Sequence, residues 1–217
     1  MPASIKHYRN IIWDWNGTLL NDLDICIDAI NKLLIRRQLS LMTRERYLEI
    51  FTFPVQEYYV EAGFDFSKEA YERVAIEFMD HYLEMVKGAR LHEQVHSALE
   101  QVRDSGRNQI ILSAMEQTAL RKLAGEHEID GYFSEIFGIS DHLAHGKLSI
   151  AGMALKETGF IKAETCLIGD TLHDAEVALA LGIPCILVAN GHQSESRLLA
   201  SGYPVIRNLN EIEKVFG

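Results

Sequence analysis

The sequence predicts an α/β fold: a parallel sheet with a helical domain inserted after its first strand. From residue 93 onward, short apolar runs alternate with amphipathic segments of helical spacing, which is the pattern of β-α units. An apolar run at 10–15 precedes a stretch at 20–88 in which the periodic segments have helical spacing. An insertion of that length is a domain rather than a loop. We therefore expect an α/β core at 1–19 and 89–217 and a helical domain at 20–88.

The first apolar run, Asn10–Trp15, is predicted to be a buried strand with Asp14 near its end and a turn at Asn16-Gly17. Residues Asp22–Arg37 place apolar side chains on one stripe, which predicts a helix. Further helices are expected at Thr43–Phe51, capped by Thr43, at Val55–Ala62, closed by Gly63, and from an N-cap at Ser67 to Gly88.

The rest of the chain alternates between helical and strand patterns. Helices are expected at Glu93–Ser105, Gln117–His127 and Ser149–Thr158, and in a segment that ends at Leu181. Strands are expected at Gln109–Ser113, Ile136–Ile139, Thr165–Gly169 and Pro184–Ala189. This alternation favours a parallel sheet with right-handed crossovers.

The composition is that of an ordinary soluble protein, with 217 residues, 47% apolar and 24% charged. A formal charge of −10 argues against a broad nucleic-acid-binding face, although a bound cation would still allow an anionic substrate. The N-terminus does not resemble a signal peptide, and no apolar run is long enough to span a membrane. Cys26, Cys166 and Cys185 form no C-x-x-C pair, so we expect buried, reduced thiols and a cytoplasmic protein.

Carboxylates follow two of the expected strands. Asp14 ends the first strand, Asp170 follows the strand at 165–169, and Asp174 lies four residues further on. Because parallel sheets bind ligands at the carboxyl ends of their strands, Asp14 and Asp170 converge if these two strands are neighbours. A hard cation such as Mg²⁺ would relieve the repulsion between the carboxylates.

A carboxylate beside Mg²⁺ can attack phosphorus and form an aspartyl-phosphate. The turn at Gly17-Thr18 offers backbone N–H groups that can form an anion-binding nest. Ser113 offers a hydroxyl at the end of a strand, and Lys147 offers a positive charge for phosphate.

Four segments together resemble the motifs of the haloacid dehalogenase superfamily, in order and over nearly the whole chain. They are W-D-W-N-G-T-L-L at 13–20, I-I-L-S-A at 110–114, Gly146-Lys147, and I-G-D-T-L-H-D at 168–174. The resemblance implies a Rossmann-like core and an α-helical cap, as in phosphoglycolate phosphatases and β-phosphoglucomutases. It also implies a Mg²⁺-dependent phosphatase that acts on a small phosphorylated metabolite.

The resemblance assigns roles to single residues. Asp14 is expected to be the nucleophile and a metal ligand, and Asn16 is expected to give its backbone carbonyl to the metal. Asp170 is expected to bind the metal directly, and Asp174 through water. Thr18, Ser113, Lys147 and the backbone of Ala114 are expected to hold the transferring phosphoryl group.

Asn16 departs from the family pattern, which usually has an aspartate there as the general acid and base. An amide has no proton to shuttle at neutral pH, and general acid–base catalysis contributes about 10²- to 10⁴-fold. Hydrolysis of an ester or anhydride, phosphotransfer or mutase activity, and a non-catalytic regulatory role therefore all remain open. The segment 47–61 contains no lysine for phosphonate cleavage by a Schiff base, and retention of both Asp170 and Asp174 argues against a dehalogenase.

Several other residues have competing interpretations. His173 either replaces the missing acid–base group or points to solvent at a helix start. His142 and His145 have a metal-binding spacing without a third partner. Arg44 and Arg46 either bind a substrate anion or lie on a solvated helix face. Trp13 and Trp15 flank Asp14 on a strand and are expected to pack in the core.

Overall fold

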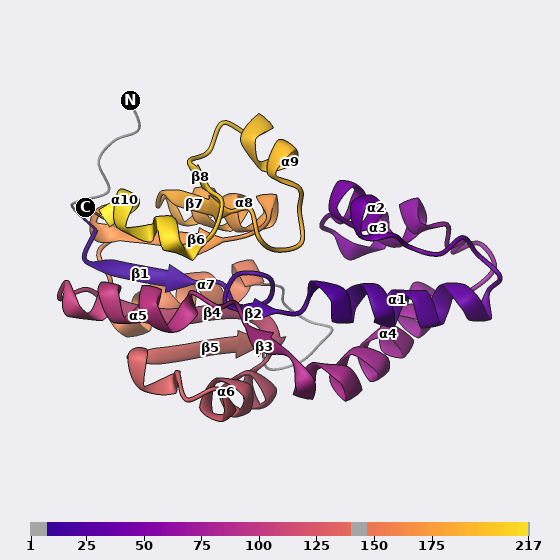
Figure 1. The fold of residues 1–217 in the computed structure, drawn as a ribbon, viewed down its shortest axis with the longest axis horizontal. Coiled ribbons are helices and arrows are strands. Elements are labelled where there is room, and N and C mark those ends of the chain that lie inside the picture. The colour runs from indigo at the N-terminus through magenta and orange to yellow at the C-terminus, as the bar shows by residue number, and fades with distance from the viewer. Residues whose placement is uncertain (1–7, 140–146, 217) are drawn as a thin grey trace.

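The computed structural model describes residues 8–139 and 147–216. His142, His145 and Gly146 lie outside the described residues. Figure 1 shows a sheet with helices on both sides and, to its right, a separate group of helices. Within the described part of the chain, no helix is long and apolar enough to cross a membrane.

The main sheet has six parallel strands in the order β5-β4-β1-β6-β7-β8. The strands are β1 Asn10–Trp13, β4 Asn108–Glu116, β5 Glu135–Ile139, β6 Thr165–Gly169, β7 Cys185–Val188 and β8 Val205–Ile206. The chain builds outward from β1 to β4 and β5, then returns to β6 on the other side of β1. This reversal makes β1 and β6 neighbours, with Trp13 beside Ile168. Open parallel sheets bind ligands at the carboxyl ends of strands where the strand order reverses in this way.

Helices cover both faces of this sheet. One face packs against α5 Val95–Asp104, α6 Gln117–Glu126 and α10 Ile212–Phe216. The other face packs against α7 Lys147–Thr158, α8 Leu172–Leu181 and α9 Glu195–Ala200. Successive strand residues alternate between the two cores, so Ile11 lies in the first and Ile12 in the second. The predicted α/β fold with a parallel sheet is therefore confirmed.

Four helices lie between two short strands, β2 Leu20–Asn21 and β3 Arg90–Leu91, which pair antiparallel. We call residues 22–89 the helical insert. Its helices are α1 Leu23–Arg36, α2 Arg44–Ile50, α3 Val55–Ala62 and α4 Tyr71–Met85. As expected, Thr43 caps α2 and Gly63 closes α3 with a left-handed backbone.

Three expectations about the elements were wrong. The stretch at 20–88 does contain a strand, because Leu20–Asn21 pairs across the base of the insert. Ser67 does not cap a helix: its N–H and hydroxyl both donate to Asp65, and α4 begins only at Tyr71. The strand expected to end at Ser113 extends to Glu116. The elements β8, α9 and α10 were not predicted.

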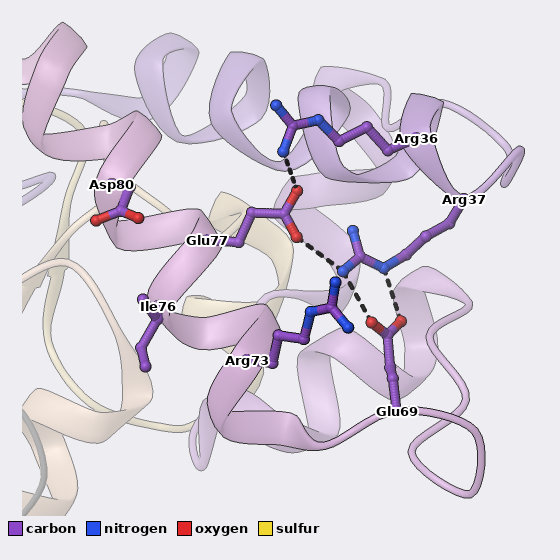
Figure 2. Close-up of a pocket in the computed structure, with 7 residues that line it drawn as sticks. All are labelled: Arg36, Arg37, Glu69, Arg73, Ile76, Glu77 and Asp80. Carbon is purple, nitrogen blue, oxygen red and sulfur yellow. Dashed lines mark hydrogen bonds and ion pairs between the residues drawn. The ribbon is translucent and has the colours of Figure 1, made fainter.

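Ion pairs tie the outer ends of α1 and α4 together, as Figure 2 shows. Arg37 pairs with Glu69 and Glu77, and Arg36 pairs with Glu77. The hollow at this place is lined by these side chains together with Arg73, Ile76 and Asp80. None of the strand-end carboxylates lines this hollow. The ion pairs around it join parts of the insert to one another.

Candidate active site

The carboxylates of Asp14, Asp170 and Asp174 meet at the carboxyl edge of the sheet. One oxygen of each lies within 4.8 Å of the others, and all three side chains are buried. The pairing of β1 with β6 places Asp14 and Asp170 side by side, and the Asp14 N–H donates to the Ile168 carbonyl at 2.9 Å. The convergence expected from strand-end placement is thus present in the structure.

Lys147 is the cation of this carboxylate cluster. It begins α7, its side chain is 3% exposed, and its Nζ contacts both Asp14 Oδ1 and Asp174 Oδ1. The other oxygen of Asp174 accepts from the Thr171 N–H and hydroxyl, which closes a capping box at the start of α8. Asp174 therefore serves both the helix start and the charge balance of the site.

Thr18 and Ser113 lie beside the carboxylates. The Thr18 hydroxyl donates to Asp170 Oδ1 at 3.0 Å and lies 3.3 Å from Asp14 Oδ2. The Ser113 hydroxyl accepts from the Met115 N–H at 3.0 Å and lies 3.5 Å from Asn16 Oδ1. Ala114, next to Ser113 on β4, is exposed.

Gly17 shapes the loop between Asp14 and Thr18. Its φ is +75°, and a Cβ there would lie 2.4 Å from an oxygen of Asp170, so only glycine fits. Its N–H already bonds to the Leu20 carbonyl and to Asp22 Oδ1, both at 2.9 Å. Because Asp22 and Leu20 occupy it, the Gly17 N–H is not free for the anion-binding nest expected at Gly17-Thr18.

Burial is the largest influence on the pKa values of Asp14 and Asp170. Burial, together with the charges of Asp174 and Asp170, raises the pKa of Asp14 to about 8, against the opposing effect of Lys147. Burial also raises the pKa of Asp170 to about 6. Burial alone would lower the pKa of Lys147, but the carboxylates of Asp14 and Asp174 raise it. Three acidic groups thus face one lysine, and the cluster favours an additional cation.

The donor set fits Mg²⁺. Carboxylate oxygens from Asp14 and Asp170 are hard ligands, and Asp174 lies within reach of the same position. Asp22, Cys26 and His192 form a second buried group of donor atoms within 4.8 Å of one another. In that second group, however, every donor is already hydrogen-bonded to a neighbour.

The side chain of Asn16 is held on its amino side. Nδ2 donates to Asp22 Oδ2 at 2.8 Å and to the Tyr82 hydroxyl at 2.6 Å. Tyr82 belongs to α4, so a residue of the helical insert contacts the side chain of Asn16. Asn16 therefore has no carboxylate of its own, and its amide is hydrogen-bonded to the buried carboxylate of Asp22.

Asp22 and His192 form a buried pair that the sequence did not lead us to expect. His192 Nε2 lies 3.1 Å from Asp22 Oδ1, its Nδ1 lies 3.1 Å from the Tyr47 hydroxyl, and its N–H donates to Asp170 Oδ2 at 2.6 Å. Burial would lower the pKa of His192, but Asp22 and the nearby Asp170 raise it to about 9. The polar run N-G-H-Q after the apolar strand β7 was the one available signal, since it too follows a strand end.

The insert is fastened to the core by the segment after β7. Carbonyl groups at the C-terminal end of α2 accept hydrogen bonds from this segment. The Ser194 N–H donates to the Leu48 carbonyl, and the Arg197 side chain donates to the carbonyls of Leu48 and Phe51. Gln193 also donates to the Phe51 carbonyl at 3.0 Å. A cationic donor at the last carbonyls of a helix is a favourable C-terminal contact. The insert therefore lies against the same segment that supplies His192.

The remaining candidate residues lie outside the carboxylate cluster. His173 stacks on Phe53 with ring centroids 4.5 Å apart and lies 3.1 Å from Glu176. Arg44 pairs with Asp24, and Arg46 donates to the Glu61 carbonyl. Both tryptophans are fully buried, which confirms their core role, and Cys26, Cys166 and Cys185 are free and buried.

Comparisons with known proteins agree on the fold. The family model for haloacid dehalogenase-like hydrolases matches residues 11–188. Three similar solved structures are a haloacid dehalogenase-like hydrolase family protein from Streptococcus pneumoniae, a putative phosphoglycolate phosphatase from Lactobacillus delbrueckii subsp. bulgaricus, and protein tyrosine kinase A from Mycobacterium tuberculosis.

The first has a TM-score of 0.82 at 20% identity over 97% of this chain and 99% of that chain. The second has a TM-score of 0.80 at 18% identity and covers 97% of this chain and 98% of that chain. The third has a TM-score of 0.81 at 17% identity and covers 98% of this chain and 99% of that chain. At these identities, the three structures show a shared fold. A comparison with curated proteins finds no match.

The Asp22–His192 pair predicts a dependence of stability on pH. His192 has a folded-state pKa of about 9 against an ordinary value of 6.5, so its stabilising effect is complete below pH 6.5 and is lost as the pH rises through 9. In EDTA, the free energy of unfolding should fall over this window, and it should fall less for His192→Gln. Urea unfolding at several pH values measures this, and equal falls in both proteins would contradict the pairing.

Proposed function

The chain belongs to the haloacid dehalogenase-like hydrolase family, and on this premise we propose that it is a Mg²⁺-dependent phosphatase. It acts on a small phosphorylated metabolite through an aspartyl-phosphate at Asp14. One observation supports this most: a buried carboxylate at the end of the central strand lies among Asp170, Asp174 and Lys147. This arrangement supplies a nucleophile, a cation-binding pair and a fixed positive charge at one place.

Asp14, Asp170 and the backbone carbonyl of Asn16 would hold Mg²⁺, with Asp174 acting through water. Bound there, the ion would supply charge neutralisation between the nucleophile and the phosphoryl group. Lys147, Thr18 and Ser113 would donate to the phosphoryl oxygens, helped by the backbone of Ala114.

The reaction then has two displacements at phosphorus. An oxygen of Asp14 forms a bond to phosphorus while the bond to the leaving oxygen breaks, and that oxygen keeps the electron pair. Water next forms a bond to phosphorus, and the bond to Asp14 breaks. This second displacement restores the carboxylate and releases phosphate.

We assign residues 1–19 and 89–217 to the catalytic core and residues 20–88 to an α-helical cap. The hydrogen bonds from Ser194 and Arg197 to α2 support this assignment, because they hold the insert against the carboxyl edge of the sheet. Such a cover excludes water from the carboxylates and contributes substrate contacts. The three free, buried thiols support a reducing compartment such as the cytoplasm.

Asn16 favours substrates with good leaving groups, such as acyl phosphates and anhydrides. An amide cannot protonate the departing oxygen, so the leaving group must be stable as an anion. The same amide cannot take a proton from water, which would leave a longer-lived aspartyl-phosphate available to another acceptor. Phosphotransfer is therefore the second candidate function.

Removing the nucleophile tests the proposal. Purified protein should hydrolyse p-nitrophenyl phosphate or acetyl phosphate with Mg²⁺, and EDTA should abolish this activity. Asp14→Asn should also abolish it, because the nucleophile is lost at nearly constant volume. Asp28→Asn, an exposed position on α1, is the control and should retain activity. Full activity of Asp14→Asn, or none in the parent on any activated phosphate, would overturn the proposal.

Restoring a carboxylate at residue 16 tests the role of that position. Asn16→Asp should raise hydrolysis of alkyl phosphates by up to about 10²- to 10⁴-fold, with a smaller gain for nitrophenyl phosphate. The new carboxylate would lie beside Asp22, because Asp22 Oδ2 is 2.8 Å from the present Nδ2 of Asn16. Two like charges at that distance repel, so one of the two carboxyl groups would keep its proton.

Initial rates across phosphates of differing leaving-group pKa measure this effect. Intact mass should be checked first, since Asn16-Gly17 can deamidate to the same aspartate. An Asn16→Asp protein no faster than the parent on every ester would refute the assignment of residue 16, and His173 and His192 would be the next residues to test.

A further inference from the structure

We propose that Asp22 is a positioning residue that fixes the amide of Asn16 with its oxygen toward the reacting groups. Asn16 then acts as an oriented hydrogen-bond acceptor in place of the missing acid and base. The consequence for catalysis rests on the proposed phosphatase function, whereas the orientation itself does not.

Asp22 is a fully buried carboxylate with donors on both oxygens. Oδ1 accepts from the Gly17 N–H at 2.9 Å and lies 3.1 Å from His192 Nε2. Oδ2 accepts from Asn16 Nδ2 and from the Tyr82 hydroxyl, both at 2.8 Å. Asp22 is thus surrounded by hydrogen-bond donors at both of its oxygens.

Because these neighbours all donate, both Asp22 oxygens act as acceptors, and the carboxylate selects the amino side of Asn16. Tyr82 acts in the same sense: its one hydroxyl proton goes to Asp22, which leaves its oxygen to accept from Asn16 Nδ2 at 2.6 Å. A flipped amide would place its oxygen against the Asp22 carboxylate and lose both hydrogen bonds. The two partners therefore determine a single orientation.

The amide oxygen consequently lies on the side of Ser113, whose hydroxyl is 3.5 Å away. Ser113 is one of the residues that we propose to hold the phosphoryl group. From this side, Asn16 Oδ1 can accept a hydrogen bond from the attacking water but cannot take its proton. In that step, the proton passes to the departing phosphate while the bond from phosphorus to Asp14 breaks.

A double-mutant cycle tests whether Asp22 acts through Asn16. The rate constant kcat for p-nitrophenyl phosphate is measured with Mg²⁺ for the parent, Asp22→Asn, Asn16→Ala and the double variant. Asp22→Asn should lower kcat by about tenfold in the parent, with a smaller change in KM, and by less than about twofold in the Asn16→Ala background. Additive losses would indicate a purely structural role and would overturn the proposal.

Tyr82→Phe provides a second, milder variant if Asp22→Asn folds poorly. It removes one hydroxyl and one of the two contacts to Nδ2, and it should show the same dependence on Asn16. Asp28→Asn is the matched control on the same helix, and its kcat should not change in either background.

An activity-independent readout separates this proposal from the proposed function. In the folded protein, the Asn16 side-chain NH₂ protons should exchange slowly with solvent by NMR, and Asp22→Asn should speed their exchange while Asp28→Asn should not. If the parent hydrolyses no activated phosphate yet shows this pattern, the phosphatase proposal fails and the orientation stands. Fast exchange of the Asn16 NH₂ protons in the parent would overturn the orientation. Equal exchange rates in Asp22→Asn and Asp28→Asn would overturn it as well.

Discussion

The burial of three carboxylates at the junction of β1 and β6 is the constraint on which the rest of the site depends. Charges of one sign at such separations repel strongly out of water, so each needs a partner. Lys147 contacts both Asp14 and Asp174, while Thr18 and the His192 N–H donate to Asp170. The backbone must also come very close: a Cβ at residue 191 would lie 2.1 Å from an Asp170 oxygen.

The same constraint links the helical insert to the chemistry. His192 contacts Asp170 through its backbone and Asp22 through its ring, while its other ring nitrogen meets Tyr47 of α2. Tyr82 of α4 donates a hydrogen bond to Asp22. Two helices of the insert thus supply hydrogen-bond partners to the Asp22–His192 pair, and Asp22 in turn binds the Gly17 N–H in the loop after β1.

The parallel sheet and the carboxylates could be predicted because both depend on local patterns. Apolar runs ending in Asp14 and Asp170 define strand ends, and the reversal of strand order then brings those ends together. The pair Asp22 and His192 could not be predicted, since 170 residues separate them and Asp22 reads as an ordinary helix start. Ser67 misled for a related reason, because a neighbouring Asp65 competes for its hydrogen bonds.

A covalent phosphoryl group on Asp14 is the central claim, and mass spectrometry of acid-quenched protein tests it most directly. After brief mixing with acetyl phosphate and Mg²⁺, the peptide that contains Asp14 should carry one phosphoryl group, and hydroxylamine should remove it. The group should accumulate in the parent protein, because Asn16 cannot take a proton from the attacking water. It should be absent from Asp14→Asn. Turnover without any adduct on that peptide, or an adduct on a different residue, would contradict the mechanism.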